Sequence, residues 1–165
     1  MLLMLMRTVE AENFSGEIRD SERSITESGR GDAAYAAEFM KALGLEPKVI
    51  ICSPFKRTVE TAQTLADNLD DPPPVQIAHS IMPGAGLDEI LKAIKSRVEC
   101  SEEDWILAVC HEPDISSCVK ELLKESGDYK IPVEPGTLIG LELTCHYGQI
   151  KGRLIFLFSP MAMRA

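Results

Sequence analysis

Apolar residues in this chain form short, nearly continuous runs, and longer stretches with helical spacing separate the runs. Runs without clean alternation of apolar and polar residues are typical of strands buried on both faces, as in a parallel sheet. We predict five such strands, at Leu2–Met6, Val49–Cys52, Trp105–Cys110, Thr137–Leu143 and Arg153–Phe158. The segment Cys145–Gly152 predicts a hairpin loop between the last two, so one of them is expected to run antiparallel.

The stretches between the runs predict four helices, at Asp32–Leu43, Pro54–Leu69, Leu87–Val98 and Asp114–Lys124. Thr26 is the expected N-cap of the first helical segment, and Ser53 that of the second, with Pro54 in its first turn. Asp70–Pro74 and Gly84–Gly86 predict loops. Alternating strands and helices indicate a three-layer α/β/α fold with a mostly parallel sheet. A length of 165 residues suits a single domain over residues 1–165.

Polar and cationic residues follow the ends of the first three predicted strands. Arg7, Ser53, Arg57 and His111 all lie shortly after such an end. In open α/β sheets, ligands bind at the carboxyl ends of the strands. We therefore expect these separate segments to meet in one site at this edge of the sheet.

The net charge of −9 argues against non-specific binding to nucleic acid or to an anionic membrane surface. No apolar stretch approaches the ~20 residues of a membrane span. The N-terminal apolar run is too short for the core of a signal peptide and has no basic region before it. We expect a protein that binds neither nucleic acid nor a membrane.

The chain has five cysteines, which are widely spaced and form no CxxC pair. This pattern argues against a disulfide framework or a zinc knuckle, and favours a reducing, cytoplasmic setting. The three histidines, His79, His111 and His146, do not cluster at the spacing of metal ligands. We expect no metal and no other cofactor.

Four motifs occur in order along the chain. They are Arg7-Thr8-Val9, Arg23–Gly29, Cys52–Ala62 and Val109–Pro113. Together they resemble the SixA-like phosphohistidine phosphatases, a branch of the histidine phosphatase (phosphoglycerate mutase-like) superfamily. That family has Arg-His-Gly, then Arg-Pro-Leu-Thr-x-x-Gly, then Ser-Ser-Pro-x-x-Arg-x-x-Gln-Thr-Ala, and finally Val-Gly-His-x-Pro. The resemblance covers nearly the whole length of the chain.

The resemblance implies that Arg7 and Arg57 hold phosphate oxygens and that His111 contacts the phosphoryl group and stabilises the transition state. The chemistry agrees, because arginine stays charged and presents a fixed fork of donors that fits a phosphoryl group. The implied ligand is phosphate, or a phosphorylated protein or small molecule.

Thr8 stands where the family has its nucleophilic histidine, and Val9 stands where the family has glycine. A threonine hydroxyl is barely nucleophilic at neutral pH unless a base takes its proton. A phosphothreonine ester would also be far more inert than a phosphohistidine, so the enzyme would stall. A β-branched residue at position 9 is expected to crowd the floor of the pocket.

Two further roles follow from the chemistry of a phosphatase. A general acid normally protonates the leaving group, and Glu10, Glu12 and Glu112 are candidates that the sequence does not separate.

A cysteine phosphatase would use Cys-x5-Arg, whereas Cys52 and Arg57 are one residue too close. We interpret Cys52 and Cys110 as small buried hydrophobic residues.

Two functional hypotheses follow. In the first, the chain is a catalytically impaired SixA-like member, a pseudoenzyme, whose pocket of Arg7, Arg57 and His111 binds a phospho-ligand or phosphoprotein. In the second, it is an active phosphatase, a hydrolase of phosphohistidine or phosphomonoesters, in which His111 or an activated water replaces the missing nucleophile.

Overall fold

The computed structural model describes residues 1–14, 16, 18–97, 99, 101, 103–124 and 131–163. Its strands are β1 (Leu2–Arg7), β2 (Pro47–Cys52), β3 (Val75–Ile77), β4 (Trp105–Cys110), β5 (Leu138–His146) and β6 (Gln149–Phe158). Its α-helices are α1 (Glu27–Ala42), α2 (Lys56–Asp67), α3 (Leu87–Lys95) and α4 (Asp114–Leu123). Three short 3-10 helices are η1 (Asp20–Glu22), η2 (His79–Ile81) and η3 (Pro160–Met163).

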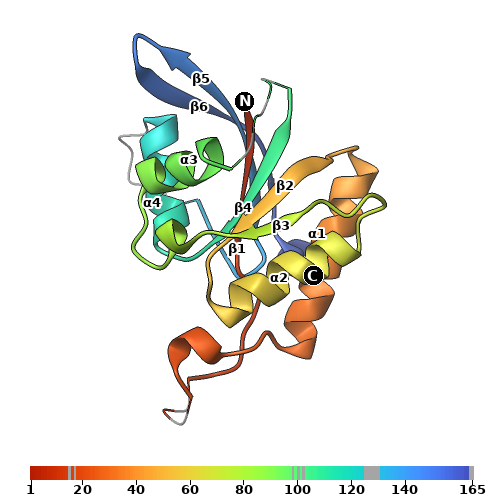
Figure 1. The fold of residues 1–165 in the computed structure, drawn as a ribbon. Helices are drawn as coiled ribbons and strands as arrows, with labels where there is room; N and C mark the ends of the chain where they lie inside the picture. The colour runs from red at the N-terminus through yellow and green to blue at the C-terminus, as the bar shows by residue number, and fades with distance from the viewer. Residues whose placement is uncertain are drawn as a thin grey trace.

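The strands form one mixed sheet in the order β3-β2-β4-β1-β5-β6 (Figure 1). The pairs β3–β2, β2–β4 and β4–β1 are parallel, whereas β1–β5 and β5–β6 are antiparallel. The predicted α/β fold with a mostly parallel sheet is therefore confirmed, as is the antiparallel hairpin at its end.

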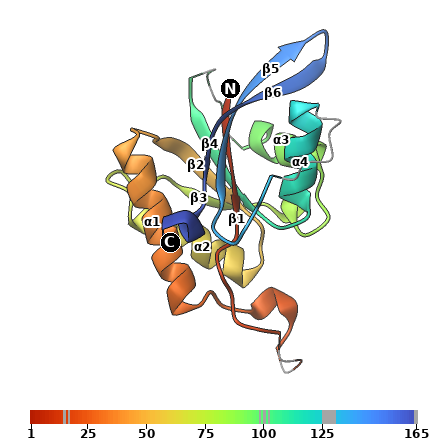
Figure 2. The ribbon, with the colours of Figure 1, turned by 180° about the vertical axis from the view of Figure 1, so that it is seen from behind.

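Helices cover both faces of the sheet, with α1 and α2 on one side and α3 and α4 on the other (Figures 1 and 2). Successive residues of β1 pack alternately into the hydrophobic cores on the two faces of the sheet. Leu3 and Leu5 belong to the core under α3 and α4, and Met4 and Met6 belong to the core under α1 and α2. Because successive side chains of a strand point to opposite faces, burial on both faces requires an unbroken apolar run. The apolar run at the start of the chain has this cause.

Thr26 caps α1 as predicted, since its hydroxyl oxygen accepts a hydrogen bond from the backbone N–H of Gly29 at 3.0 Å. The predicted cap of α2 is wrong. The N-cap is Phe55 and the helix starts at Lys56, so Pro54 precedes the helix. Ser53 is fully buried in the turn between β2 and α2, where its backbone oxygen accepts from the hydroxyl of Thr58 at 2.9 Å.

Other details also differ from prediction. Helix α1 begins at Glu27 and not at Asp32. The short strand β3 was not predicted, because its three residues follow a proline run that favours a loop. Helix α3 ends at Lys95, and the predicted end at Val98 lies outside the described residues. The predicted loop Cys145–Gly152 is mostly strand. Its turn is Tyr147-Gly148, both with positive φ (51° and 77°), as two-residue hairpin turns require.

The parallel strands end together at one edge of the sheet. Arg7 at the end of β1 pairs with Cys110 at the end of β4, and Cys52 at the end of β2 pairs with Val109. The chain between β1 and α1 leaves the sheet at this same edge (Figures 1 and 2). No helix in the described part of the chain is long and apolar enough to cross a membrane.

Candidate functional site

A pocket with a volume of about 480 Å³ lies at the carboxyl edge of the sheet. Arg7, Thr8, Arg57 and His111, the residues singled out from the sequence, all line it. The other lining residues are Val9, Glu10, Ala11, Asp20, Arg23, Pro83, Glu112 and Pro135. Ser53 does not line the pocket. Three arginines and a histidine in one pocket suit an anionic ligand.

Arg7 is held in place from the side of β5. Its backbone N–H donates to the carbonyl of Thr137 at 2.9 Å, and its side-chain Nη1 donates to the carbonyl of Val133 at 2.6 Å. This second contact uses one of the five N–H donors of the guanidinium. The fork is thus oriented by the backbone and keeps further donors for a ligand.

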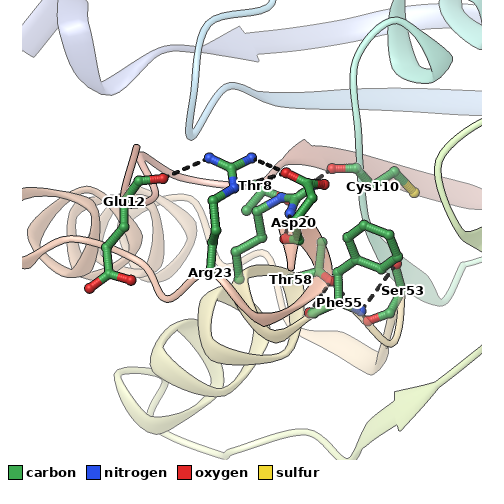
Figure 3. Close-up of polar contacts among 9 residues, drawn as sticks. Thr8, Glu12, Asp20, Arg23, Ser53, Phe55, Thr58 and Cys110 are labelled. Atoms are coloured by element: carbon green, nitrogen blue, oxygen red, sulfur yellow. Dashed lines mark hydrogen bonds and ion pairs between the residues drawn. The ribbon is translucent and has the colours of Figure 1, made fainter. Parts of the chain in front are cut away.

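Thr8 is nearly buried, with 7% of its surface exposed. Its backbone N–H and its hydroxyl both donate to the carbonyl oxygen of Cys110, each at 3.1 Å (Figure 3). A hydroxyl that donates its proton to a backbone carbonyl has no base to accept that proton. In this arrangement Thr8 is not activated for attack on a phosphorus atom.

The loop after Thr8 packs tightly against α1. A Cβ atom on Gly29 would lie 2.3 Å from the carbonyl oxygen of Glu10 and 3.0 Å from Cγ2 of Val9. Val9 is 3% exposed and belongs to the core under α1 and α2. Helix α1 therefore carries a glycine where the pocket loop and the buried side chain of Val9 approach it most closely.

Arg57 lies on the first turn of α2 and is 9% exposed. Its guanidinium carbon is 4.8 Å from the centre of the Phe55 ring. Nη1 donates to the backbone oxygen of Asp20 at 2.6 Å, and Nη2 donates to Oδ2 of the same residue at 3.1 Å. Burial lowers the pKa of Arg57, and the charge of Asp20 offsets part of this effect. The guanidinium stays charged at neutral pH because it is a very weak acid.

His111 follows β4 and is 6% exposed. Its ring meets the ring of Phe55 edge-on, with 5.3 Å between the two ring centres. Burial, with a smaller contribution from the charge of Arg57, lowers the pKa of His111 to about 4. The imidazole is thus neutral at pH 7, and its buried Nε2 has no hydrogen-bond partner. A buried polar atom without a hydrogen bond is unfavourable, and a bound ligand would supply the missing bond to Nε2.

The carboxylates predicted as general acids have other partners. Glu10 Oε2 accepts from the hydroxyl of Thr26 at 2.9 Å, and Glu12 Oε2 accepts from the N–H of Ser24 at 3.2 Å. Glu112 accepts from the N–H and the hydroxyl of Ser116 at 3.1 and 2.7 Å. Glu10 and Glu112 line the pocket and Glu12 does not, which narrows the candidates to two.

Three cysteines, Cys52, Cys110 and Cys118, are buried in the hydrophobic cores on the two faces of the sheet. Burial raises the pKa of Cys52 to about 11, raises that of Cys118 to about 12 and raises that of Cys110 further still. A thiol held in its protonated form is a poor nucleophile. The interpretation of Cys52 and Cys110 as small buried hydrophobic residues is thus confirmed, and the structure offers no support for a cysteine phosphatase. Cys100 lies outside the described residues.

Comparison with known proteins relates both the sequence around the pocket and the fold to histidine phosphatases. The model of the histidine phosphatase superfamily (branch 1) matches residues 5–82, which include Arg7, Thr8 and Arg57. The solved structure of the protein histidine phosphatase SixA complexed with tungstate aligns with a TM-score of 0.78 over 99% of both chains, at 21% identity. Residues 5–82 thus match the histidine phosphatase superfamily (branch 1), and the whole chain has the fold of the solved histidine phosphatase.

Two curated proteins similar to this chain are uncharacterized. One is a chloroplastic protein of Arabidopsis thaliana, 31% identical over 68 residues, a match that covers 41% of this chain and 31% of the relative. The other, from Picosynechococcus sp. (strain ATCC 27264 / PCC 7002 / PR-6), is 25% identical over 122 residues, which covers 74% of this chain and 73% of the relative.

Sequence reasoning missed one residue of this pocket and left another without a role. Asp20 was not singled out, and Arg23 was noted only as part of a motif. Asp20 lies three residues before Arg23, and the two form an ion pair at 2.6 Å. A single carboxylate on an exposed 3-10 helix carries no signal of its own in the sequence, although its spacing from an arginine of a motif is a weak signal. Within the described ranges, no three His, Cys, Asp or Glu side chains gather as metal ligands do.

Proposed function

We propose that this chain is a SixA-like member of the histidine phosphatase superfamily that binds a phosphoryl group in the pocket of Arg7, Arg57 and His111 but turns it over poorly. The observation that carries the proposal is the hydrogen bond from the Thr8 hydroxyl to the Cys110 carbonyl. In the proposed assignment, Thr8 occupies the place of the family's nucleophile. A hydroxyl that donates its hydrogen bond to a backbone carbonyl has no base to activate it for attack. The arginines and the histidine around it can still bind a phosphoryl group.

The chemistry of the pocket supports a phosphoryl ligand. Two arginine forks approach from β1 and from α2, and a neutral imidazole follows β4. A phosphoryl group offers three strong acceptor oxygens and up to two negative charges, which matches such a set of donors. The superfamily acts on phosphate-containing substrates, so the proposed ligand is a phosphorylated protein or small molecule. We further propose that the protein works in a reducing, cytoplasmic compartment.

A second function is favoured by one observation. The unpartnered Nε2 of neutral His111 could accept a proton from an attacking water, or could itself attack phosphorus. The chain would then be an active phosphatase by a route that does not use position 8. The two functions differ in a single measurable quantity, the turnover of the native chain.

The test measures both binding and turnover. Binding of inorganic phosphate is followed by calorimetry, and hydrolysis of a phosphohistidine peptide and of a generic phosphomonoester is followed by release of phosphate. The variants are Thr8→His, His111→Gln and Arg57→Ala. Lys56→Ala is the matched control, because it removes a positive charge from the neighbouring residue, which does not line the pocket.

We expect native protein to bind phosphate without turnover, Arg57→Ala to weaken binding at least tenfold, and Lys56→Ala to bind as the native chain does. Thr8→His is expected to gain hydrolysis, and Thr8→His with Val9→Gly to gain more. Clear turnover by the native chain that is lost in His111→Gln would overturn the first function in favour of the second. Absence of phosphate binding in the native chain would overturn both.

A further inference from the structure

The carboxylate of Asp20 is shared between two arginines of the pocket, Arg23 and Arg57. Figure 3 shows its contact with Arg23. Its Oδ1 accepts from Nε of Arg23 at 2.8 Å and lies 2.6 Å from Nη2 of the same guanidinium. Its Oδ2 accepts from Nη2 of Arg57 at 3.1 Å, and its backbone oxygen accepts from Nη1 at 2.6 Å. Asp20 thus satisfies donors of Arg57 that a phosphoryl ligand would otherwise use.

The contact between Asp20 and Arg57 can be broken without disturbing the hydrophobic core. The short helix η1 that carries Asp20 has no buried residue, so no apolar core holds it in place. The Asp20 side chain is 48% exposed, whereas that of Arg57 is 11% exposed and packs on the Phe55 ring. An exposed carboxylate on a polar segment can withdraw at low cost, while the buried guanidinium stays where it is.

The charge of Asp20 is stabilised by its partners. Burial raises the pKa of this carboxyl, but the hydrogen bond from Arg23 and the charge of Arg57 outweigh that effect and hold the pKa below its ordinary value. Asp20 is therefore ionised at neutral pH, and it competes as an anion for the same donors as any external ligand.

We propose that Asp20 is a specificity-determining residue of the phosphate pocket, an internal anion that an external ligand must displace. The inference rests on the proposed function. A free carboxylate offers two oxygens and one charge, the same as Asp20, and so gains nothing by exchange. A phosphoryl group offers three oxygens and a greater charge. It can replace Asp20 at Arg57 and also reach Arg7 and the unpartnered Nε2 of His111. Asp20 therefore admits phosphoryl groups and rejects carboxylates.

The alternative role for Asp20 is structural. An acidic partner could merely hold Arg57 in its binding geometry, as the ring of Phe55 does from another side. The two roles predict opposite effects of removing the charge. A competitor lowers the affinity of the pocket for anions, and a positioning residue raises it.

The experiment compares native protein with Asp20→Asn, Glu22→Gln and Arg57→Ala. Glu22 lies on the same 3-10 helix, is exposed and does not line the pocket, so its variant matches the change in net charge. Binding of inorganic phosphate, sulfate and acetate is measured by calorimetry at constant ionic strength and neutral pH. Chemical shifts of the arginine side chains identify the site of binding.

We expect Asp20→Asn to bind phosphate about tenfold more tightly than native protein, which corresponds to ~1.4 kcal/mol, and to gain measurable affinity for acetate. Glu22→Gln should behave as native protein does. Equal or weaker phosphate binding by Asp20→Asn, with native protein binding through Arg57, would overturn the role of Asp20 and leave the pocket's function intact. Phosphate binding by neither native protein nor Asp20→Asn would overturn the proposed function and this inference together. Binding by Asp20→Asn alone would support the role of Asp20 as a competing anion and would overturn the proposed function of the native chain.

Discussion

The hydroxyl and the backbone N–H of Thr8 converge on one acceptor, the carbonyl oxygen of Cys110. This pair ties the first residue after β1 to the last residue of β4, at the point where both strands reach the pocket. The contact gives Thr8 a structural task that requires its hydroxyl as a donor. The same contact withholds that hydroxyl from nucleophilic chemistry.

Replacement of Thr8 by valine should therefore destabilise the fold. Thr8→Val removes one buried hydrogen bond and is expected to lower the free energy of unfolding by about 1 kcal/mol. Thr137→Val is the matched control, because the buried hydroxyl of Thr137 has no hydrogen-bond partner. Its removal should raise the free energy of unfolding by about 1 kcal/mol. Urea unfolding of the two variants measures the contrast, and equal effects of the same sign would refute it.

Gly29 is expected to be essential for the loop that carries Thr8. Gly29→Ala places a methyl group 2.3 Å from the carbonyl oxygen of Glu10, so the loop or the helix must shift. We expect a loss of about 2–3 kcal/mol in the free energy of unfolding and weaker phosphate binding. Gly31, two residues along the same helix, has open space around a new Cβ atom. Gly31→Ala should raise the free energy of unfolding by about 0.5–1 kcal/mol. If both alanines stabilise the fold, the close approach at Gly29 is not real.

Protonation of His111 should oppose folding in mild acid. The folded chain holds the pKa of His111 at about 4, below the ordinary 6.5, because the ring is buried beside Arg57. Between these values the unfolded chain takes up a proton that the folded chain does not. Stability is therefore lost as the pH falls from 6.5 toward 4. At pH 5 the loss relative to pH 7 is expected to reach up to about 2 kcal/mol.

NMR titration of the histidine rings measures the pKa of His111 directly, and phosphate in the pocket should raise it because an anion favours the charged ring. His111→Gln should lose less stability between pH 7 and pH 5 than native protein does. His79→Gln, a change at an exposed position, should follow the native curve. A His111 ring that titrates near pH 6.5 in the absence of phosphate would contradict the prediction.

Phe55 is expected to position two groups of the pocket at once. Its ring lies under the guanidinium of Arg57 and against the edge of His111. Phe55→Leu keeps the position apolar but removes the ring, so it should weaken phosphate binding about 3–10-fold. Phe39→Leu is the control, because Phe39 stacks on Phe158 outside the pocket at a centroid distance of 4.4 Å. It should lower stability and leave affinity near the native value. Equal affinities for the two variants would show that Phe55 acts only through stability.

The fold was largely predictable because burial on both faces of the sheet leaves a direct trace in the sequence. Five strands and four helices were predicted near their observed places, from runs such as Leu2–Met6 and from the cap at Thr26. The predictions failed where local signals compete. At Ser53, a residue type that favours N-caps is instead buried in the turn before α2, and at Tyr147-Gly148 a hairpin turn is shorter than the polar stretch around it.

The sequence by itself determined that Arg7, Arg57 and His111 gather in one pocket, although it did not single out Asp20. The carboxyl ends of neighbouring parallel strands meet at one edge, so Arg7 and His111 had to come close to each other, and α2 brings Arg57. The tertiary structure alone decided what each group does there. The direction of the Thr8 hydroxyl, the neutral state of His111 and the pairing of Asp20 with Arg57 depend on distances of a few ångströms and on burial. Neither quantity is written in residue types or in their spacing, because contacts between segments far apart in the chain set them both.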